Sequence, residues 1–200
     1  KTVEDDPEFD ARKATKKLRA YVEGHETAIR KKAEIMVDHF HANVVAKGKI
    51  GGKARAMVVT TSIARAISYF EAIRDYLVER GSPYQAIVAF SDFDRDGVKV
   101  TETDYNRFPS AEITSRVQED PYRFLVVADK YQTGYDEPLL HTMYVDKPLA
   151  GVLAVQTLSR LNRARPGKTD TAVLDFANDA DQIQAAFEPY YRTTILAGET

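Results

Sequence analysis

After Lys53 the sequence alternates short apolar segments with segments of helical periodicity, and this alternation constrains the fold more than any other feature. The apolar segments have strand length, are rich in Val, Ile, Phe and Tyr, and cover 54–60, 85–90, 124–128, 142–145 and 172–176. Between the first two, apolar residues at three- and four-residue steps predict a helix with Ser62 as N-cap and Gly81 as C-terminal stop. Further helices are expected from Ser110 onward, over 153–163 and over 179–187. The alternation predicts an α/β fold, with a parallel sheet and helices on both faces.

A helical segment precedes this alternation. Residues 1–10 are acidic and the residues after them are basic, which is typical of a solvated boundary. From Glu26 to Val44 apolar residues recur at helical steps, which predicts an amphipathic helix that ends before Gly48. Because the sequence starts at Lys1 without Met, we expect it to be a piece of a longer chain. The expected parts are a helical linker or attachment (1–53), the α/β domain (54–180) and the start of a C-terminal helical region (181–200).

The composition excludes several classes of protein. The 28 Lys and Arg residues nearly balance the 30 Asp and Glu residues, so a nucleic-acid surface could only be a local patch. The absence of Cys excludes disulfide scaffolds, thiolate zinc sites and cysteine nucleophiles. No apolar run approaches the roughly 20 residues of a membrane span, and the N-terminus has no signal-peptide pattern. We therefore expect a cytoplasmic protein without a membrane partner.

Three groups of polar residues follow predicted strands or open helices, where parallel α/β sheets bind their ligands. The first group is Thr60, Thr61 and Ser62, between a strand and a helix. Hydroxyl groups and free backbone N–H groups at a helix N-terminus can bind a phosphate. Simple capping of the helix explains the same residues, so both interpretations remain open.

The second group lies in the segment 129–138, which contains Thr133, Gly134 and Asp136. A Gly beside Thr and Asp lets the backbone approach a ligand closely, and a carboxylate can accept hydrogen bonds from ribose hydroxyls. A turn before Pro138 would explain the same residues.

The third group is Gln156, Arg160 and Arg163. In a continuous helix their spacing places the three side chains within roughly 60° of one another on one face. Residues 147–169 contain five basic residues and no acidic one, so the arginines lack partners nearby in the sequence. The planar guanidinium group matches phosphate oxygens and can stabilise charge during phosphoryl transfer. The alternative is a solvated basic face.

In this order the three groups resemble motifs IV, V and VI of the second RecA-like domain of superfamily 2 helicases and translocases. Within this superfamily, the residues of the three motifs are most similar to those in the motor subunit of type I restriction-modification enzymes. The stretches that carry the resemblance are ARAMVVTTS (54–62), RFLVVADKYQTGYDEPLLHTMYVDKP (123–148) and QTLSRLNRARPGK (156–168). The resemblance implies a RecA-like sheet in an ATP-dependent translocase of double-stranded DNA. One departure is Ser159, where many members of the superfamily have Gly before the first arginine.

The resemblance also implies roles for individual residues. Arg163 is expected to act as the arginine finger on the γ-phosphate of ATP, with Arg160 assisting it. The residues expected to bind or sense the nucleotide are Gly134, Asp136, which would lie near the ribose, and Gln156, which would couple the site to the nucleic-acid path. The residues expected to lie near DNA are Thr60, Ser62 and Thr133.

Three other patterns are interpreted as structural. Gly167-Lys168-Thr169 looks like the end of a phosphate-binding loop, but the first Gly of that motif is missing and no strand precedes it, so we expect a turn. The segment 92–97 copies the start of a calcium loop, but the Glu required at its twelfth position is Thr103. The closely spaced His39 and His41 would diverge on a helix, which disfavours zinc. No metal ligand is therefore assigned.

The sequence lacks a complete Walker A loop, an Asp-Glu-Ala-His-like segment and a Glu-x-Lys nuclease motif. We therefore expect half of a motor, inactive alone, with ATP and Mg²⁺ bound mainly by the first RecA-like domain of the parent chain. The expected partners are double-stranded DNA, the first motor domain and nuclease domain of that chain, and methyltransferase and specificity subunits. The alternatives are the C-terminal motor domain of another superfamily 2 DNA-repair or RNA helicase, a non-catalytic interaction module and, less favoured, a stand-alone nucleotide-binding enzyme.

Overall fold

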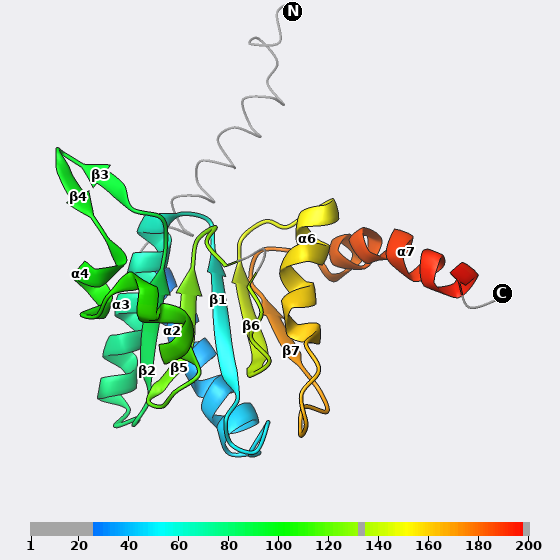
Figure 1. The fold of residues 1–200 in the computed structure, drawn as a ribbon, viewed down its shortest axis with the longest axis horizontal. Coiled ribbons are helices and arrows are strands. Elements are labelled where there is room, and N and C mark those ends of the chain that lie inside the picture. The colour runs from blue at the N-terminus through cyan, green and yellow to red at the C-terminus, as the bar shows by residue number, and fades with distance from the viewer. Residues whose placement is uncertain (1–25, 132–134, 198–200) are drawn as a thin grey trace, which may run out of the picture.

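A five-stranded sheet forms the centre of the molecule (Figure 1), in a computed structural model that describes residues 26–131 and 135–197. The strand order is β2-β5-β1-β6-β7, and every neighbouring pair is parallel. The strands are β1 (Arg55–Thr60), β2 (Gln85–Ala89), β5 (Tyr122–Val127), β6 (Leu140–Asp146) and β7 (Ala172–Asp175). The prediction of a parallel α/β sheet is therefore confirmed.

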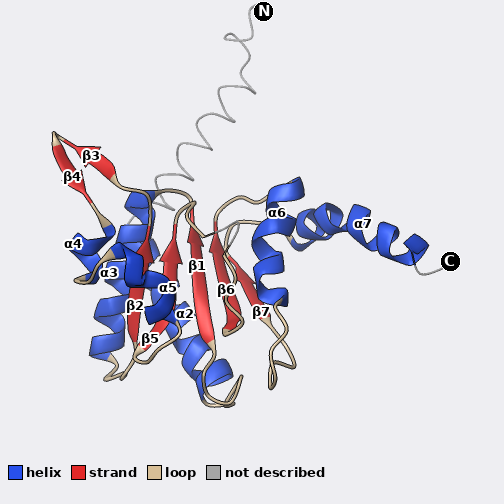
Figure 2. Cartoon of the chain, in the orientation of Figure 1, coloured by secondary structure: helices blue, strands red, loops and turns tan. Residues whose placement is uncertain are grey.

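Helices cover both faces of the sheet (Figure 2). Alternate residues of one strand serve opposite faces: Val58 lies in the core with α2 and α3, and Val59 lies in the core on the other face. The helices are α2 (Glu26–Phe40), α3 (Ile63–Glu79), α4 (Glu102–Asn106), α5 (Ile113–Val117), α6 (Gly151–Leu158) and α7 (Ala180–Ala197), with the irregular turns η2 (His41–Val45), η3 (Ser110–Glu112) and η4 (Ser159–Asn162). Within the described part of the chain, no helix is long and apolar enough to cross a bilayer.

The N-terminal amphipathic helix is present as α2, and it belongs to the core of the sheet. Met36, Val37 and Phe40 are fully buried, and the Phe40 ring lies 4.7 Å from the ring of Phe124 on β5. The proposed boundary between residues 53 and 54 therefore separates two segments that share one hydrophobic core.

The helix predicted over 153–163 is shorter than expected. α6 ends at Leu158, a 3₁₀ turn continues to Asn162, and Arg163 has extended backbone angles (φ −74°, ψ 120°). The prediction that Gln156, Arg160 and Arg163 share one helical face is thus wrong for Arg163. The chain leaves the helix before it reaches this arginine.

A hairpin not predicted from the sequence follows β2. β3 (Phe93–Arg95) and β4 (Val98–Val100) pair antiparallel and project from the body of the protein (Figure 1). Asp96 and Gly97, at its tip, both have positive φ angles (54° and 77°). An Asp-Gly pair between two short strands is a common hairpin turn, so the sequence carried this signal within the segment that resembles a calcium loop.

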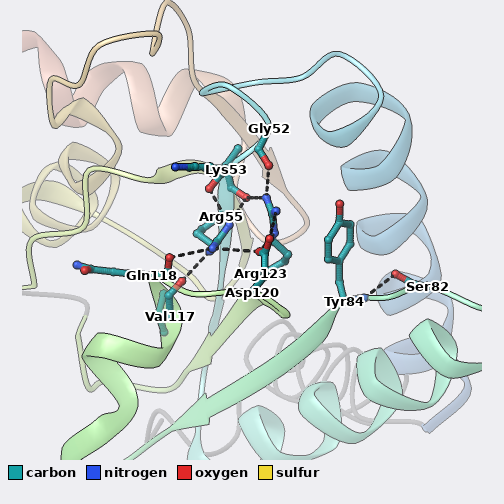
Figure 3. A network of polar contacts seen from close by, with 10 residues as sticks. Gly52, Lys53, Arg55, Ser82, Tyr84, Val117, Gln118, Asp120 and Arg123 are labelled. Carbon is teal, nitrogen blue, oxygen red and sulfur yellow. Dashed lines mark hydrogen bonds and ion pairs between the residues drawn. The ribbon is translucent and has the colours of Figure 1, made fainter.

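Two buried arginines hold the amino-terminal ends of β1 and β5 together (Figure 3). Arg55 donates to the carbonyl oxygens of Val117 (2.6 Å), Lys53 (2.7 Å) and Gln118 (3.1 Å). Arg123 donates to the carbonyl oxygens of Gly52 (2.7 Å) and Ala54 (3.1 Å), and its guanidinium carbon lies 4.7 Å from the centre of the Tyr84 ring. Both arginines also contact the carboxylate of Asp120. Burial and the neighbouring Arg123 lower the pKa of Arg55 to about 10.

Three histidines, the partly buried His39 and His41 and the buried His141, make the stability of the chain dependent on pH. Burial lowers the pKa values of His39, His41 and His141 below their ordinary value of 6.5. The folded state therefore binds protons at these histidines less readily than the unfolded state. The neutral histidines contribute to the stability of the fold fully above pH 6.5, and this contribution is lost as the pH falls through the folded pKa values. We expect the Tm to fall as the pH is lowered from about 6.5 to 5.5, above the range in which carboxylates titrate. Thermal denaturation of His39→Gln should show a shallower fall, and an unchanged Tm over this range in the unmodified chain would contradict the prediction.

Candidate functional site

The first predicted group, at the carboxyl end of β1, divides into a buried and an exposed hydroxyl. The Thr60 side chain is fully buried, and its Oγ1 donates to the carbonyl oxygens of Val127 (3.1 Å) and Ser62 (3.2 Å). Ser62 is exposed, and its Oγ accepts from the backbone N–H of Arg65 (3.3 Å). The predicted N-cap is therefore confirmed. Because the Thr60 hydroxyl faces the interior, Ser62 and the first N–H groups of α3 are the groups that could contact a phosphate at this edge.

The second group lies partly outside the described residues, since the predictions for Thr133 and Gly134 concern residues 132–134. In the described part, Tyr135 and Glu137 are buried and Asp136 between them is exposed. The Glu137 carboxylate accepts from the N–H of Leu139 (2.8 Å) and from the Tyr135 hydroxyl (3.5 Å). The two buried neighbours therefore fix the backbone so that Asp136 projects outward.

The third group meets the second group on the surface. Arg163 Nε lies 3.2 Å from Asp136 Oδ1, and 46% of the Arg163 side chain and 65% of the Asp136 side chain are exposed. Arg160 is partly buried and donates to the carbonyl oxygens of Tyr135 (3.3 Å) and Gln156 (3.2 Å). The Gln156 side chain is exposed on α6, and its backbone carbonyl oxygen accepts from Arg160. Asp136, Arg160 and Arg163, of which Asp136 is distant in the sequence from the arginines, thus form one polar face.

Arg163 can leave Asp136 for another partner at little cost in free energy. Exposed ion pairs contribute about 0–1 kcal/mol, because water screens the charges and both side chains lose entropy. A phosphate group carries more negative charge than a carboxylate and fits the same planar guanidinium. The geometry therefore allows Arg163 to turn to a phosphate and Asp136 to accept from hydroxyl groups.

The middle section of the chain matches a known protein family. Residues 97–178 match the family described as Type I restriction enzyme subunit R domain 3. Curated homologues of the chain are type I restriction endonuclease subunits. This match includes Asp136 and the segment from Gln156 to Arg163, and so confirms the resemblance seen in the sequence.

Two curated relatives illustrate how much of a type I subunit this homologue spans. The type I restriction enzyme HindI endonuclease subunit of Haemophilus influenzae is 33% identical over 78 residues, which are 38% of this chain and 7% of that protein. The putative type I restriction enzyme MjaVIIP endonuclease subunit of Methanocaldococcus jannaschii is 25% identical over 138 residues, which are 62% of this chain and 13% of that protein. The aligned segments are therefore small parts of much longer subunits.

A solved structure supports the RecA-like fold of this chain. The structure of Mss116p bound to ssRNA and AMP-PNP superposes with a TM-score of 0.54 and 13% sequence identity, over 80% of this chain and 28% of that one. At this identity the likeness concerns the fold alone, and the predicted RecA-like sheet is confirmed.

The segment after Arg163 contains the Gly-Lys-Thr pattern that we interpreted as a turn. Pro166 and Gly167 form that turn, with φ +81° at Gly167 and a bond from Lys168 N–H to the Arg165 carbonyl oxygen (3.0 Å). This interpretation is therefore confirmed. The Lys168 Nζ is buried without a hydrogen-bond partner among the described residues, and burial lowers the pKa of Lys168. Lys168 and Arg163 both line a hollow of about 240 Å³.

Two buried carboxylates at the carboxyl edge of the sheet, Asp146 and Glu102, were not predicted from the sequence. Asp146, at the end of β6, contacts Lys32 Nζ (2.7 Å) and accepts from the Tyr69 hydroxyl (2.6 Å). Glu102, at the start of α4, contacts Lys130 Nζ through both carboxylate oxygens (2.8 Å each). The sequence around Glu102 held one usable signal, because Thr101 and Asp104 form a capping box that marks a helix start. Nothing local indicates the partners of either carboxylate, which come from distant segments.

Proposed function

We propose that this chain is the second RecA-like motor domain of a type I restriction endonuclease subunit, which supplies an arginine to ATP held by the first motor domain. The observation that carries the proposal is the meeting of Asp136 with Arg163 on an exposed face of a chain related to these subunits. The parent activity would be ATP-dependent translocation along double-stranded DNA that serves cleavage.

The donor set on this face fits a nucleotide. Two guanidinium groups lie near one carboxylate, so Arg163 can bind phosphate oxygens while Asp136 accepts from ribose hydroxyls. When bound, ATP would supply the γ-phosphoryl group whose transfer to water drives movement. Arg163 would stabilise the charge that develops in that transfer, and Arg160 would hold the Tyr135 carbonyl oxygen and support Asp136. We assign the phosphate cradle and the Mg²⁺ site to the first motor domain, as the family resemblance implies.

The remaining partners follow from the same proposal. Double-stranded DNA would lie along the carboxyl edge of the sheet, with Ser62 and the N-terminal N–H groups of α3 directed at its phosphates. The first motor domain would face Asp136 and Arg163. The nuclease domain of the parent chain and the methyltransferase and specificity subunits would complete the enzyme.

The alternative within motors is a DNA-repair or RNA helicase. One observation favours keeping it: the structure that shares this fold at a TM-score of 0.54 is of a protein bound to ssRNA. A non-catalytic interaction module remains the alternative outside motors, and the ATPase of the full-length parent distinguishes it.

The chain by itself should hydrolyse essentially no ATP, with or without DNA and Mg²⁺, because phosphoryl transfer requires a phosphate cradle and a bound metal that we assign to the first motor domain. The experiment compares phosphate release by the chain, by its Arg163→Ala variant and by a protein-free blank. All three rates should agree. A DNA-stimulated rate that Arg163→Ala removes would show that the chain contains a complete ATPase and would sink the proposal.

DNA binding by the chain should be weak and independent of sequence, because the candidate contacts are backbone N–H groups and hydroxyls directed at phosphates. Titration of several unrelated duplexes and of single-stranded RNA over a series of salt concentrations measures this. A preference for one duplex sequence by more than about tenfold would contradict the prediction. A comparable preference for RNA over every duplex would favour the RNA-helicase alternative.

A further inference from the structure

Glu102 is a buried carboxylate that joins three segments of the fold. Its side chain is 1% exposed. Oε1 accepts from the backbone N–H of Phe90 at the end of β2 (2.8 Å), and both oxygens contact Lys130 Nζ (2.8 Å each). Lys130 follows β5 and opens the segment that leads to Asp136.

Attachment of α4 does not require this carboxylate. Asn106, at the other end of α4, accepts from the Val88 N–H (2.9 Å) and donates to the Val88 carbonyl oxygen (2.8 Å), which fixes the helix to the edge of β2. A buried ion pair is in general no more stabilising than apolar side chains packed in its place. The stability of the ion pair by itself therefore does not account for Glu102 and Lys130.

A continuous series of contacts runs from Glu102 to the polar face. Lys130 Nζ lies 5.4 Å from the centre of the Tyr131 ring, and the Tyr131 and Tyr135 rings are 4.8 Å apart. Tyr131 has a positive φ angle of 65°, a backbone conformation that costs energy for a bulky residue and persists only where neighbouring contacts hold it. The carbonyl oxygen of Tyr135 accepts from Arg160, and the next residue, Asp136, contacts Arg163.

We propose that Glu102 is a positioning residue for the nucleotide-facing pair, acting through Lys130, Tyr131 and Tyr135 to fix Asp136 and Arg163. This inference rests on the proposed function, because it concerns the same face. It assigns a role to the corner formed by β2 and α4, which lies outside the resembling motifs. Glu102, through Lys130, would fix the positions of the Tyr131 and Tyr135 rings, and these rings would fix the position of the Asp136 backbone.

The test measures DNA-stimulated ATP turnover of the full-length subunit at saturating ATP and DNA. Glu102→Gln keeps the acceptor for the Phe90 N–H and removes the charge, and Tyr131→Leu keeps bulk and removes the ring contact. Each should lower turnover by about tenfold or more, because misplacement by about 1 Å costs up to about a hundredfold. ATP turnover of the double variant should be no more than about twofold below that of the less active single variant, since both changes break one series of contacts. Tyr131→Phe, which keeps the ring, should stay within about twofold of the unmodified enzyme.

Hydrogen exchange of the backbone amides in the peptide that begins at Tyr135, measured in the same full-length variants, gives a readout that does not depend on turnover. Exchange should be faster in Glu102→Gln and Tyr131→Leu, and it should be unchanged in the matched control Glu112→Gln, which breaks the exposed pair with Arg116. If Glu102→Gln does not fold, Lys130→Gln removes the same ion pair from its partly exposed side.

Three results would overturn the inference: turnover within about twofold of the unmodified enzyme in a folded Glu102→Gln, unchanged exchange at Tyr135, or single effects that multiply in the double variant. Arg163→Ala, measured in parallel, separates this failure from failure of the proposed function. If Arg163→Ala retains turnover, the proposed function fails. If it abolishes turnover while Glu102→Gln does not lower it, only the positioning role fails.

Discussion

Arg163→Ala in the full-length subunit should lower ATP turnover by about 10³- to 10⁵-fold, the range that arginine fingers contribute to phosphoryl transfer. The Arg163 side chain is half exposed and its ion pair with Asp136 lies on the surface, so the Tm should move by no more than a surface substitution moves it. Steady-state phosphate release and thermal denaturation of the same preparations measure the two effects. A large loss of turnover without a loss of stability is the result expected of an arginine that acts on substrate.

Three further variants make this prediction specific. Arg163→Lys should recover little, because a point charge cannot reproduce the planar guanidinium. Arg165→Ala, two residues further along the exposed segment, removes a charge of the same type and should leave turnover unchanged. Leu161→Ala should instead lower stability by about 2–5 kcal/mol, because this leucine is 2% exposed in the core on the α6 side of the sheet. If Arg163→Ala unfolded the protein, or left turnover within a few-fold, the assignment of motif VI would have to be abandoned.

Arg55→Ala should lower the free energy of unfolding of this chain by about 2–4 kcal/mol, because it leaves buried carbonyl groups without a donor and opens space beside Arg123. The carbonyl oxygens of Val117 and Lys53 accept from Arg55 at 2.6 and 2.7 Å, and they join the α5 end and the turn before β1 to the sheet. Urea denaturation gives the free energy of unfolding, and an unchanged m value would show that the change lies in stability and not in the denatured state.

Matched variants separate the hydrogen bonds of Arg55 from its bulk and charge. Arg55→Met restores most of the packing and should recover only part of the loss, and Arg55→Lys keeps the charge but cannot reach the same set of carbonyl groups. The exposed Arg165→Ala should change the free energy of unfolding by less than about 0.5 kcal/mol. Equal stability of Arg55→Ala and Arg165→Ala would contradict the structural role of the buried arginine.

The sheet could be predicted because its strands are buried on both faces. β1 and β6 are buried along their whole lengths, and the middle of each appears in the sequence as an apolar run, AMVV in β1 and MYV in β6. The alternation with α3 and α6 then indicates parallel pairing. The meeting of Asp136 with Arg163 could be expected only from the family resemblance. Periodicity placed Arg163 incorrectly on one helical face with Gln156 and Arg160, since α6 ends before Arg163 and the extended backbone brings the arginine to Asp136.

The remaining features depend on contacts between residues distant in the sequence. Glu102 and Lys130 are separated by a strand and two helices, and no local pattern distinguishes Glu102 from a residue that only starts a helix. The same is true of Arg55 and Arg123, which appear as charged residues at the starts of apolar strands and become buried only when β1 and β5 pair. Such pairs follow from the register of the sheet, and this register cannot be inferred from local patterns in a single sequence.

The contact between Asn106 and Val88 also bears on how the protein avoids association through its sheet. β2 is an edge strand, and an unpaired edge offers N–H and C=O groups to a strand of another molecule. The amide of Asn106 occupies both groups of Val88, and Glu102 occupies the N–H of Phe90, so the outward-facing main chain near the end of this edge is already satisfied. A short helix thereby takes the place of a sixth strand, and the edge is closed to aggregation without a longer sheet.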